Sequence, residues 1–173
     1  MLRVDRPQDV FTANEPSEHR ARLVSHVIPE DHVIVHRGQD LAAEGKTYDR
    51  IIVDAPCTGL GALRRRPEAR WRRTTADLKE LVQIQKELLD AAVSILNPGG
   101  VIAYVTCSPH LFETKIQVVD ALRRHSELEA LSIMEFLPTE VPTSVVTVDG
   151  SVQLWTHQNE SDSMFMSLLR KNA

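Results

Sequence analysis

The chain has 173 residues, of which 42 % are hydrophobic and 25 % are charged. These proportions are ordinary for a globular protein and exclude a mainly disordered, collagen-like or coiled-coil chain. The length predicts a single domain over residues 1–173. The net charge is −4, but residues 64–126 carry an excess of four positive charges between two acidic flanks. A basic segment of this kind can face a polyanion.

No apolar stretch approaches the roughly 20 residues that cross a bilayer, so we expect no membrane-spanning helix. The first ten residues contain no apolar core of a secretory signal. The two cysteines, Cys57 and Cys107, form no CxxC motif, so we expect no metal site. Two free thiols without an export signal predict a cytoplasmic protein.

Short elements are predicted in the amino-terminal part. Residues 10–13 and 32–36 read as short strands, and Ser17 can cap a helix that starts after it. Residues 38–46 read as a loop. Residues 48–54 form an apolar run that ends in a carboxylate, which is typical of a strand buried on both faces.

The middle of the chain predicts longer elements. An apolar stripe at helical spacing runs over residues 74–96, and Thr74 with Asp77 resembles a capping box. A second buried strand is predicted at 101–106. Ser108 at the N-cap and Pro109 at the first helical position then predict a helix over residues 108–125.

The tail predicts mainly strands. Residues 129–136 and 164–169 can each form one, and residues 145–155 read as a hairpin around an Asp-Gly turn. Strands that alternate with helices predict an α/β fold with a mostly parallel sheet.

Two cysteine segments follow the two buried strands. Since the helix at 74–96 connects these strands, we expect them to be neighbours with Cys57 and Cys107 facing one cleft. A helix start directly after Cys107 favours its thiolate, although free cysteines are more often small core residues. Asp54 can either cap the turn at 58–61 or bind a polar substrate.

Ten residues between these segments hold six arginines and one tryptophan. This cluster can contact phosphates, with the indole ring stacked on a base, although a charge run is often only a solvated surface. The seven residues expected to bind RNA are Arg64, Arg65, Arg66, Arg70, Trp71, Arg72 and Arg73.

The two cysteine motifs make the chain resemble a known family. The stretch that begins Asp-Ala-Pro-Cys-Thr-Gly-Leu-Gly at Asp54, followed by Tyr-Val-Thr-Cys-Ser-Pro-His at Tyr104, resembles the RNA cytosine-5 methyltransferases of the Sun/Fmu family. The resemblance is dense over residues 49–114. It implies a Rossmann-like sheet, the cofactor S-adenosylmethionine and a ribosomal RNA substrate.

The resemblance also implies a role for each site residue. Cys107 would attack C6 of cytosine and thereby make C5 nucleophilic, and Cys57 would serve the release of the product. Asp54 would hold the N3/N4 edge of the base. Glu15, Asp54 and Pro56 would contact the cofactor.

The family has a glycine-rich cofactor loop on a first strand that precedes the position of Glu15. Only fourteen residues precede Glu15, and the first glycine is Gly38, so we expect a sheet without that strand and loop. Open strand edges recruit partners. We therefore expect the segment 1–35 to pair directly with the strand at Ile51, to be displaced, or to pair with a second copy in a homo-oligomer.

The leading interpretation is a truncated RNA cytosine-5 methyltransferase. The alternative is an inactive RNA-binding fragment or pseudo-enzyme. A cysteine hydrolase that uses Cys107 with His110 is a third possibility, but no orienting motif supports it.

Overall fold

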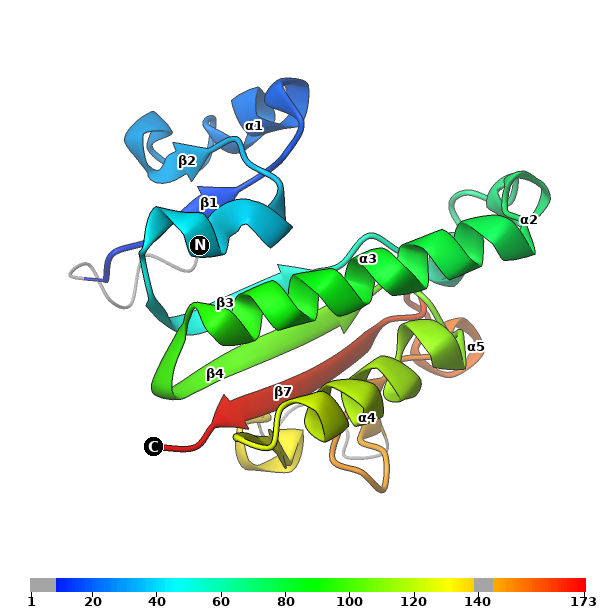
Figure 1. Ribbon diagram of the computed structural model, residues 1–173. Helices are drawn as coiled ribbons and strands as arrows, with labels where there is room; N and C mark the ends of the chain where they lie inside the picture. Colours follow the sequence, from blue (N-terminus) through cyan, green and yellow to red (C-terminus); the bar gives the residue numbers. More distant parts are fainter. Residues whose placement is uncertain (1–8, 139–144) are drawn as a thin grey trace.

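A computed structural model describes residues 9–138 and 145–173 (Figure 1). Its central sheet has the strand order β3-β4-β7-β5, and a short strand, β6, also pairs with β7. The strands span Tyr48–Asp54 (β3), Leu96–Thr106 (β4), Leu128–Leu131 (β5), Val152–Gln153 (β6) and Phe165–Lys171 (β7).

Two helices cover one face of this sheet, α3 (Thr75–Ser94) and α4 (Lys115–Arg124). The predicted capping box is confirmed, because the Thr74 side chain accepts from the Asp77 amide while the Asp77 carboxylate accepts from the Thr74 amide. Helix α3 joins β3 to β4, and the two strands pair in parallel as predicted.

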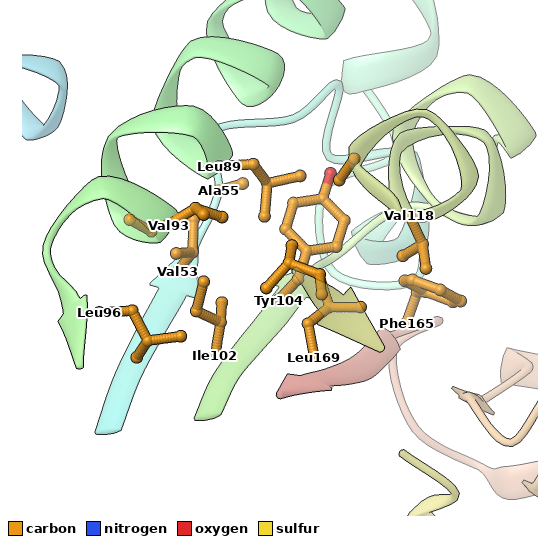
Figure 2. Close-up of a cluster of buried hydrophobic side chains, with 13 residues drawn as sticks. Val53, Ala55, Leu89, Val93, Leu96, Ile102, Tyr104, Val118, Phe165 and Leu169 are labelled. Carbon is orange, nitrogen blue, oxygen red and sulfur yellow. The ribbon is translucent and has the colours of Figure 1, made fainter. Parts of the chain in front are cut away.

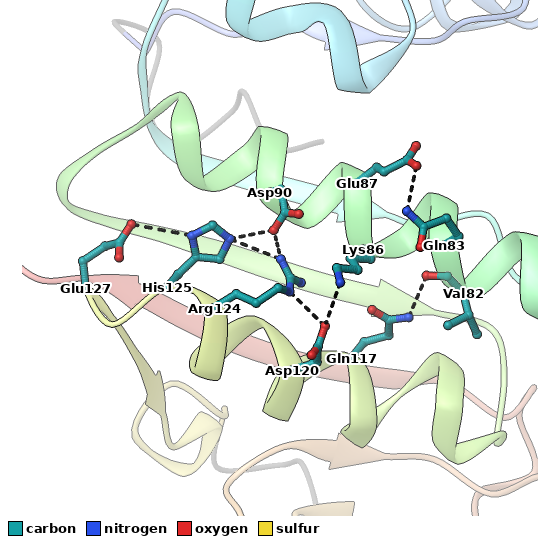
Figure 3. A network of polar contacts seen from close by, with 10 residues as sticks. All are labelled: Val82, Gln83, Lys86, Glu87, Asp90, Gln117, Asp120, Arg124, His125 and Glu127. Carbon is teal, nitrogen blue, oxygen red and sulfur yellow. Dashed lines mark hydrogen bonds and ion pairs between the residues drawn. The ribbon is translucent and has the colours of Figure 1, made fainter.

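The core lies between this face of the sheet and the two helices (Figure 2). Leu89 of α3 and four strand side chains are fully buried there; the four are Ile102, Tyr104, Phe165 and Leu169. Figure 3 shows that polar contacts also join the helices: Asp90 of α3 binds Arg124 and His125, which end α4. The orientation of both helices on the sheet is therefore held by apolar packing and by charge.

The sheet is mixed: the prediction of a mostly parallel sheet holds for the strand directions, because only β7 runs the other way, but most of the pairings are antiparallel. Strand β7 runs against the other strands and lies between β4 and β5, which makes its pairings with both antiparallel. The prediction that β3 is buried on both faces is wrong, since Val53 is buried but Ile52 is 62 % exposed. The reason is that the helices α3 and α4 cover only one face.

The segment after Cys107 differs from its prediction. No helix starts at Ser108: a short 3₁₀ helix, Leu111–Glu113, comes first, and α4 begins only at Lys115. The Ser108 hydroxyl donates to the Glu113 carboxylate and accepts from the His110 amide. These bonds hold a compact turn in place of the expected first helical turn.

The amino-terminal residues form a separate two-stranded parallel sheet, β1 (Ala13–Asn14) and β2 (Val33–Ile34), with α1 (Glu18–Val24) between them. Ser17 occupies the N-cap position of α1, but its side chain makes no capping bond. A 3₁₀ helix, Gly38–Glu44, replaces the expected loop and packs on α3.

Direct pairing of this segment with β3 is contradicted. Within the described residues, β3 pairs only with β4, and β1 pairs only with β2. No described strand therefore pairs with the outer edge of β3. Association of two copies of the chain through this edge remains a prediction.

The tail follows its prediction in part. Strand β7 is confirmed, and β5 is shorter than expected because a 3₁₀ helix, Ile133–Glu135, follows it. The hairpin is reduced to one bridge between Val146 and Val152, around Gly150 with a φ of 80°. The remaining helices are short: α2 (Ala69–Arg72), α5 (Thr156–Asn159) and two 3₁₀ helices, Glu30–His32 and Leu60–Ala62. No helix among the described residues is long and apolar enough to cross a membrane.

Candidate active site

Two thiols meet where β3 and β4 end. Cys57 lies three residues after β3, and Cys107 directly follows β4. Their Sγ atoms are 3.2 Å apart, within hydrogen-bonding distance for sulfur. The Ala55 amide also donates to the Val105 carbonyl at 3.0 Å, which continues the strand pairing into the loops. The prediction that the two strands are neighbours and bring Cys57 and Cys107 together is confirmed.

The two thiols differ in acidity. A hydrogen bond from Cys57 lowers the pKa of Cys107 to about 7, and partial burial and the Asp54 charge oppose this effect. The hydrogen bond to Cys107 raises the pKa of Cys57 far above that of an ordinary thiol, and burial adds to this rise. Cys107 is therefore the more acidic of the two thiols, and a hydrogen bond from Cys57 stabilises its thiolate form. The predicted helix start is not the cause, since α4 begins eight residues after Cys107.

The alkylation of Cys107 should report this arrangement. We expect its rate with iodoacetamide to rise with pH around a midpoint of about 7, because only the thiolate reacts. Cys57→Ala removes the donor that stabilises the thiolate, so the pKa rises, the midpoint moves to higher pH and the rate at pH 7 falls. Mass spectrometry of the Cys107 peptide measures the rate. A midpoint that stays or falls in Cys57→Ala would contradict the proposed hydrogen bond.

A buried polar network lies behind the thiols. Glu113 is fully buried, and its carboxylate accepts hydrogen bonds from Thr58, Ser108 and Gln85. The Tyr104 hydroxyl donates to the Glu113 carbonyl at 2.9 Å. Sequence reasoning missed this network, because an isolated acid beside apolar residues carries no signal of burial.

Asp54 and Pro56 lie at the carboxyl end of β3 and in the loop after it. The Asp54 residue is exposed, and its carboxylate makes no hydrogen bond or ion pair within the described part of the chain. It is therefore open to a ligand and does not cap the turn at 58–61. The Pro56 carbonyl accepts from the Gln85 side chain at 2.9 Å, which ties this loop to α3.

Glu15 follows β1 in the separate two-stranded sheet. Its carboxylate accepts from the Ser17 amide at 2.9 Å and pairs with Arg20 at 2.8 Å. The structure thus brings Cys57, Cys107 and Asp54 together at the carboxyl ends of β3 and β4, while Glu15 belongs to another sheet.

The hydrogen-bond acceptors of Glu15 and Asp54 fit part of a nucleoside site. The Glu15 carboxylate follows a parallel strand and can accept from ribose hydroxyls, and the Asp54 carboxylate is open. The described residues before Glu15 contain no glycine-rich loop. Glu15 and Asp54 therefore fit the nucleoside part of S-adenosylmethionine. The described residues do not include a glycine-rich loop that would hold the rest of the cofactor.

The arginine cluster, Arg64–Arg73, is divided by its contacts. Three members bind within the chain: Arg64 donates to the Glu160 carbonyl, Arg65 pairs with Asp162, and Arg73 donates to the Thr58 carbonyl at 3.1 Å. The other three arginine side chains make no hydrogen bond or ion pair within residues 9–138 and 145–173; they are Arg66, Arg70 and Arg72. The Trp71 side chain is 82 % exposed. Half of the arginines in this cluster therefore fasten the segment to the rest of the chain, and the other half are free to bind a ligand.

His110 does not partner Cys107. Its Nδ1 atom accepts from the Phe112 amide at 3.3 Å, and its ring stacks on the Phe112 ring. The only side-chain hydrogen-bond partner of the Cys107 thiol within the described residues is Cys57. This geometry does not support the cysteine hydrolase. No group of histidine, cysteine and acidic residues there could hold a metal ion.

Comparison with known proteins identifies the family. Residues 1–170 match the family described as 16S rRNA methyltransferase RsmB/F. The chain belongs to this family. The cofactor of this family is S-adenosylmethionine, as the resemblance implied.

Two curated relatives support the assignment. The putative methyltransferase MT1451 of Mycobacterium tuberculosis is 48 % identical over 165 residues, which cover 92 % of this chain and 35 % of the relative. Ribosomal RNA small subunit methyltransferase B of Pectobacterium carotovorum is 38 % identical over 136 residues, which cover 79 % of this chain and 29 % of the relative. The chain thus spans about a third of the length of these RsmB/F relatives.

Two solved structures share the fold. PH0851 superposes with a TM-score of 0.77 and 26 % identity, covering 92 % of this chain and 36 % of that one. NSun6 from Pyrococcus horikoshii, solved with SFG, has a TM-score of 0.77 and 22 % identity, covering 94 % and 41 %. The expected Rossmann-like methyltransferase fold is confirmed.

Proposed function

We propose that this chain carries the catalytic part of an enzyme that methylates C5 of cytosine in ribosomal RNA. The observation that carries the proposal is the pair of thiols 3.2 Å apart, one more acidic than the other, in a member of an rRNA methyltransferase family. Two adjacent thiols of different acidity suit a reaction that needs a nucleophile first and a proton acceptor later.

Cys107 is the proposed nucleophile. Its thiolate adds to C6 of the cytosine ring, and the new carbon–sulfur bond turns C5 into an enamine-like carbon that can accept a methyl group. The lowered pKa of Cys107 keeps a large share of thiolate near neutral pH. Asp54, exposed beside the thiols, holds the N3/N4 edge, since its carboxylate can accept a hydrogen bond from the N4 amino group.

Cys57 is the proposed base of the release step. The hydrogen bond with Cys107 is the largest cause of its raised pKa. When the Cys107 sulfur bonds to carbon, its negative charge is lost, so the pKa of Cys57 falls. The Cys57 thiol then passes its own proton to solvent, and the resulting thiolate removes the C5 proton. The electrons of the C5–H bond form the C5–C6 double bond, the C6–S bond breaks, and Cys107 leaves as a thiolate. Cys57 thus becomes a base only after the adduct has formed.

The cofactor supplies the electrophilic methyl group when it is bound. Glu15 would accept from its ribose hydroxyls, and Asp54 and Pro56 would line the side near the thiols. The carboxylates of Glu15 and Asp54 and the position of Pro56 beside Cys57 support this assignment.

RNA is the proposed partner of the arginine cluster. We expect replacement of Arg66, Arg70 and Arg72 by alanine to weaken RNA binding and to flatten its salt dependence by about one unit of slope per lost phosphate contact. Fluorescence anisotropy with a single-stranded RNA at several salt concentrations measures both. Arg65→Ala is the control, because Asp162 already binds this side chain. If RNA affinity depended equally on salt in the triple variant and in the unchanged protein, the cluster would be a solvated surface that does not contact RNA.

A direct assay tests the proposed activity. The full-length protein is incubated with 16S rRNA and S-adenosylmethionine that carries a labelled methyl group, and the RNA is digested to nucleosides. We expect the label in 5-methylcytidine. RNA binding without any labelled 5-methylcytidine would favour the alternative, an RNA-binding pseudo-enzyme.

A further inference from the structure

Glu113 is a buried acid that the proposed reaction does not use. Its side chain is 0 % exposed, and it lies between the two loops that carry the cysteines. One carboxylate oxygen accepts from the Thr58 amide at 2.7 Å and from the Gln85 amide at 3.3 Å. The other accepts from the Thr58 and Ser108 hydroxyls, both at 2.6 Å.

These contacts tie the residue after one cysteine to the residue after the other. Thr58 directly follows Cys57, and Ser108 directly follows Cys107. Four donors satisfy the two carboxyl oxygens, which would otherwise be costly to bury. Removing it leaves the donors of both loops without their acceptor, so the loops lose a shared anchor.

We propose that Glu113 is a positioning residue that holds the Cys57 and Cys107 thiols in contact. This inference rests on the proposed function for its catalytic meaning, but the contact between the thiols is testable by itself. Backbone bonds such as Gly61 to Cys107 fix the course of the loops. Glu113 fixes the turns that follow the two cysteines, and with them the directions of the thiol side chains.

A two-thiol cross-linking reaction provides the test. A dibromo-bimane loses one bromide to each thiolate and becomes fluorescent only when both carbon–sulfur bonds have formed. We expect Glu113→Ala to slow the cross-linking of Cys57 to Cys107 about tenfold, because small misplacements of reacting groups cost large factors in rate. Glu113→Gln should stay within about threefold of the unchanged protein, because its amide oxygen still accepts and both hydroxyls can accept from its NH₂ group.

Two further variants separate positioning from general loss of stability. Leu128→Ala, in the buried part of β5 at the far edge of the sheet, destabilises the fold without touching the cysteine loops. It should cross-link at the normal rate. Ser108→Ala removes one of the four hydrogen bonds to Glu113, together with the bond from the His110 amide, and should slow cross-linking by about threefold. If the circular dichroism spectrum shows that Glu113→Ala is unfolded, the cross-linking rate of Ser108→Ala tests the positioning role instead.

Normal cross-linking in folded Glu113→Ala or, failing that, in Ser108→Ala would overturn the inference, as would an equal loss in Leu128→Ala. Methylation by the full-length variants separates this outcome from the proposed function. If the unchanged protein never methylates RNA but the Glu113→Ala variant loses cross-linking, only the methyltransferase proposal is contradicted. Methylation and cross-linking that both survive Glu113→Ala would contradict the positioning role alone.

Discussion

The Cys57→Ala protein is expected to accumulate a covalent complex with RNA in the presence of S-adenosylmethionine. Without the Cys57 sulfur, no thiolate stands beside the adduct to remove the C5 proton, so the Cys107–C6 bond persists after methyl transfer. Labelled RNA that migrates with the protein on a denaturing gel measures this complex. We expect it to exceed the amount in the unchanged full-length protein by on the order of 10²-fold, the scale of a lost proton-transfer group.

Cys107→Ala is the matched control. It removes the attacking sulfur, so it should form no covalent complex and lose methylation by a factor on the order of 10³ or more, as expected for the loss of a nucleophile. Its fold should be intact, because Cys107 is only partly buried. A covalent band in Cys107→Ala together with none in Cys57→Ala would show that the two roles are exchanged.

Gly61→Ala is expected to disrupt the site from the backbone. A Cβ atom at this position would lie 2.0 Å from the Ser163 carbonyl oxygen and 2.7 Å from the Cys107 carbonyl oxygen. The Gly61 amide donates to the Cys107 carbonyl, and the Gly61 carbonyl accepts from the Ser163 amide. Both neighbours are backbone, so they must move. We expect a loss of about 3 kcal/mol in the free energy of unfolding, at the upper end for overpacked sites.

Urea denaturation measures this loss, and Gly59→Ala is its control in the same loop. Gly59 has a φ of 71°, which strains alanine, but its Cβ would meet no atom within 4 Å. Its expected cost is therefore only about 1 kcal/mol, the strain of one left-handed residue. If Gly61→Ala destabilised the protein no more than Gly59→Ala, the close approach at Gly61 would be refuted.

Elements with a strong local pattern were predictable from the amino-acid sequence. Helix α3 carries both an apolar stripe and its own capping box, and β3 is an apolar run with a clear end. Because α3 connects β3 to β4, the order of elements alone placed Cys57 near Cys107. The helix predicted after Ser108 failed, since the buried Glu113 carboxylate binds the Ser108 hydroxyl and favours a turn.

The sequence by itself therefore determined the family, the two cysteine motifs and their meeting at one sheet edge. Only the tertiary structure decided the acidity of the thiols, the burial of Glu113 and the division of the arginine cluster. The physical reason is distance along the chain: Arg65 pairs with Asp162, 97 residues away, and Thr58 binds Glu113, 55 residues away. Such contacts arise when the sheet assembles, and no local periodicity encodes them.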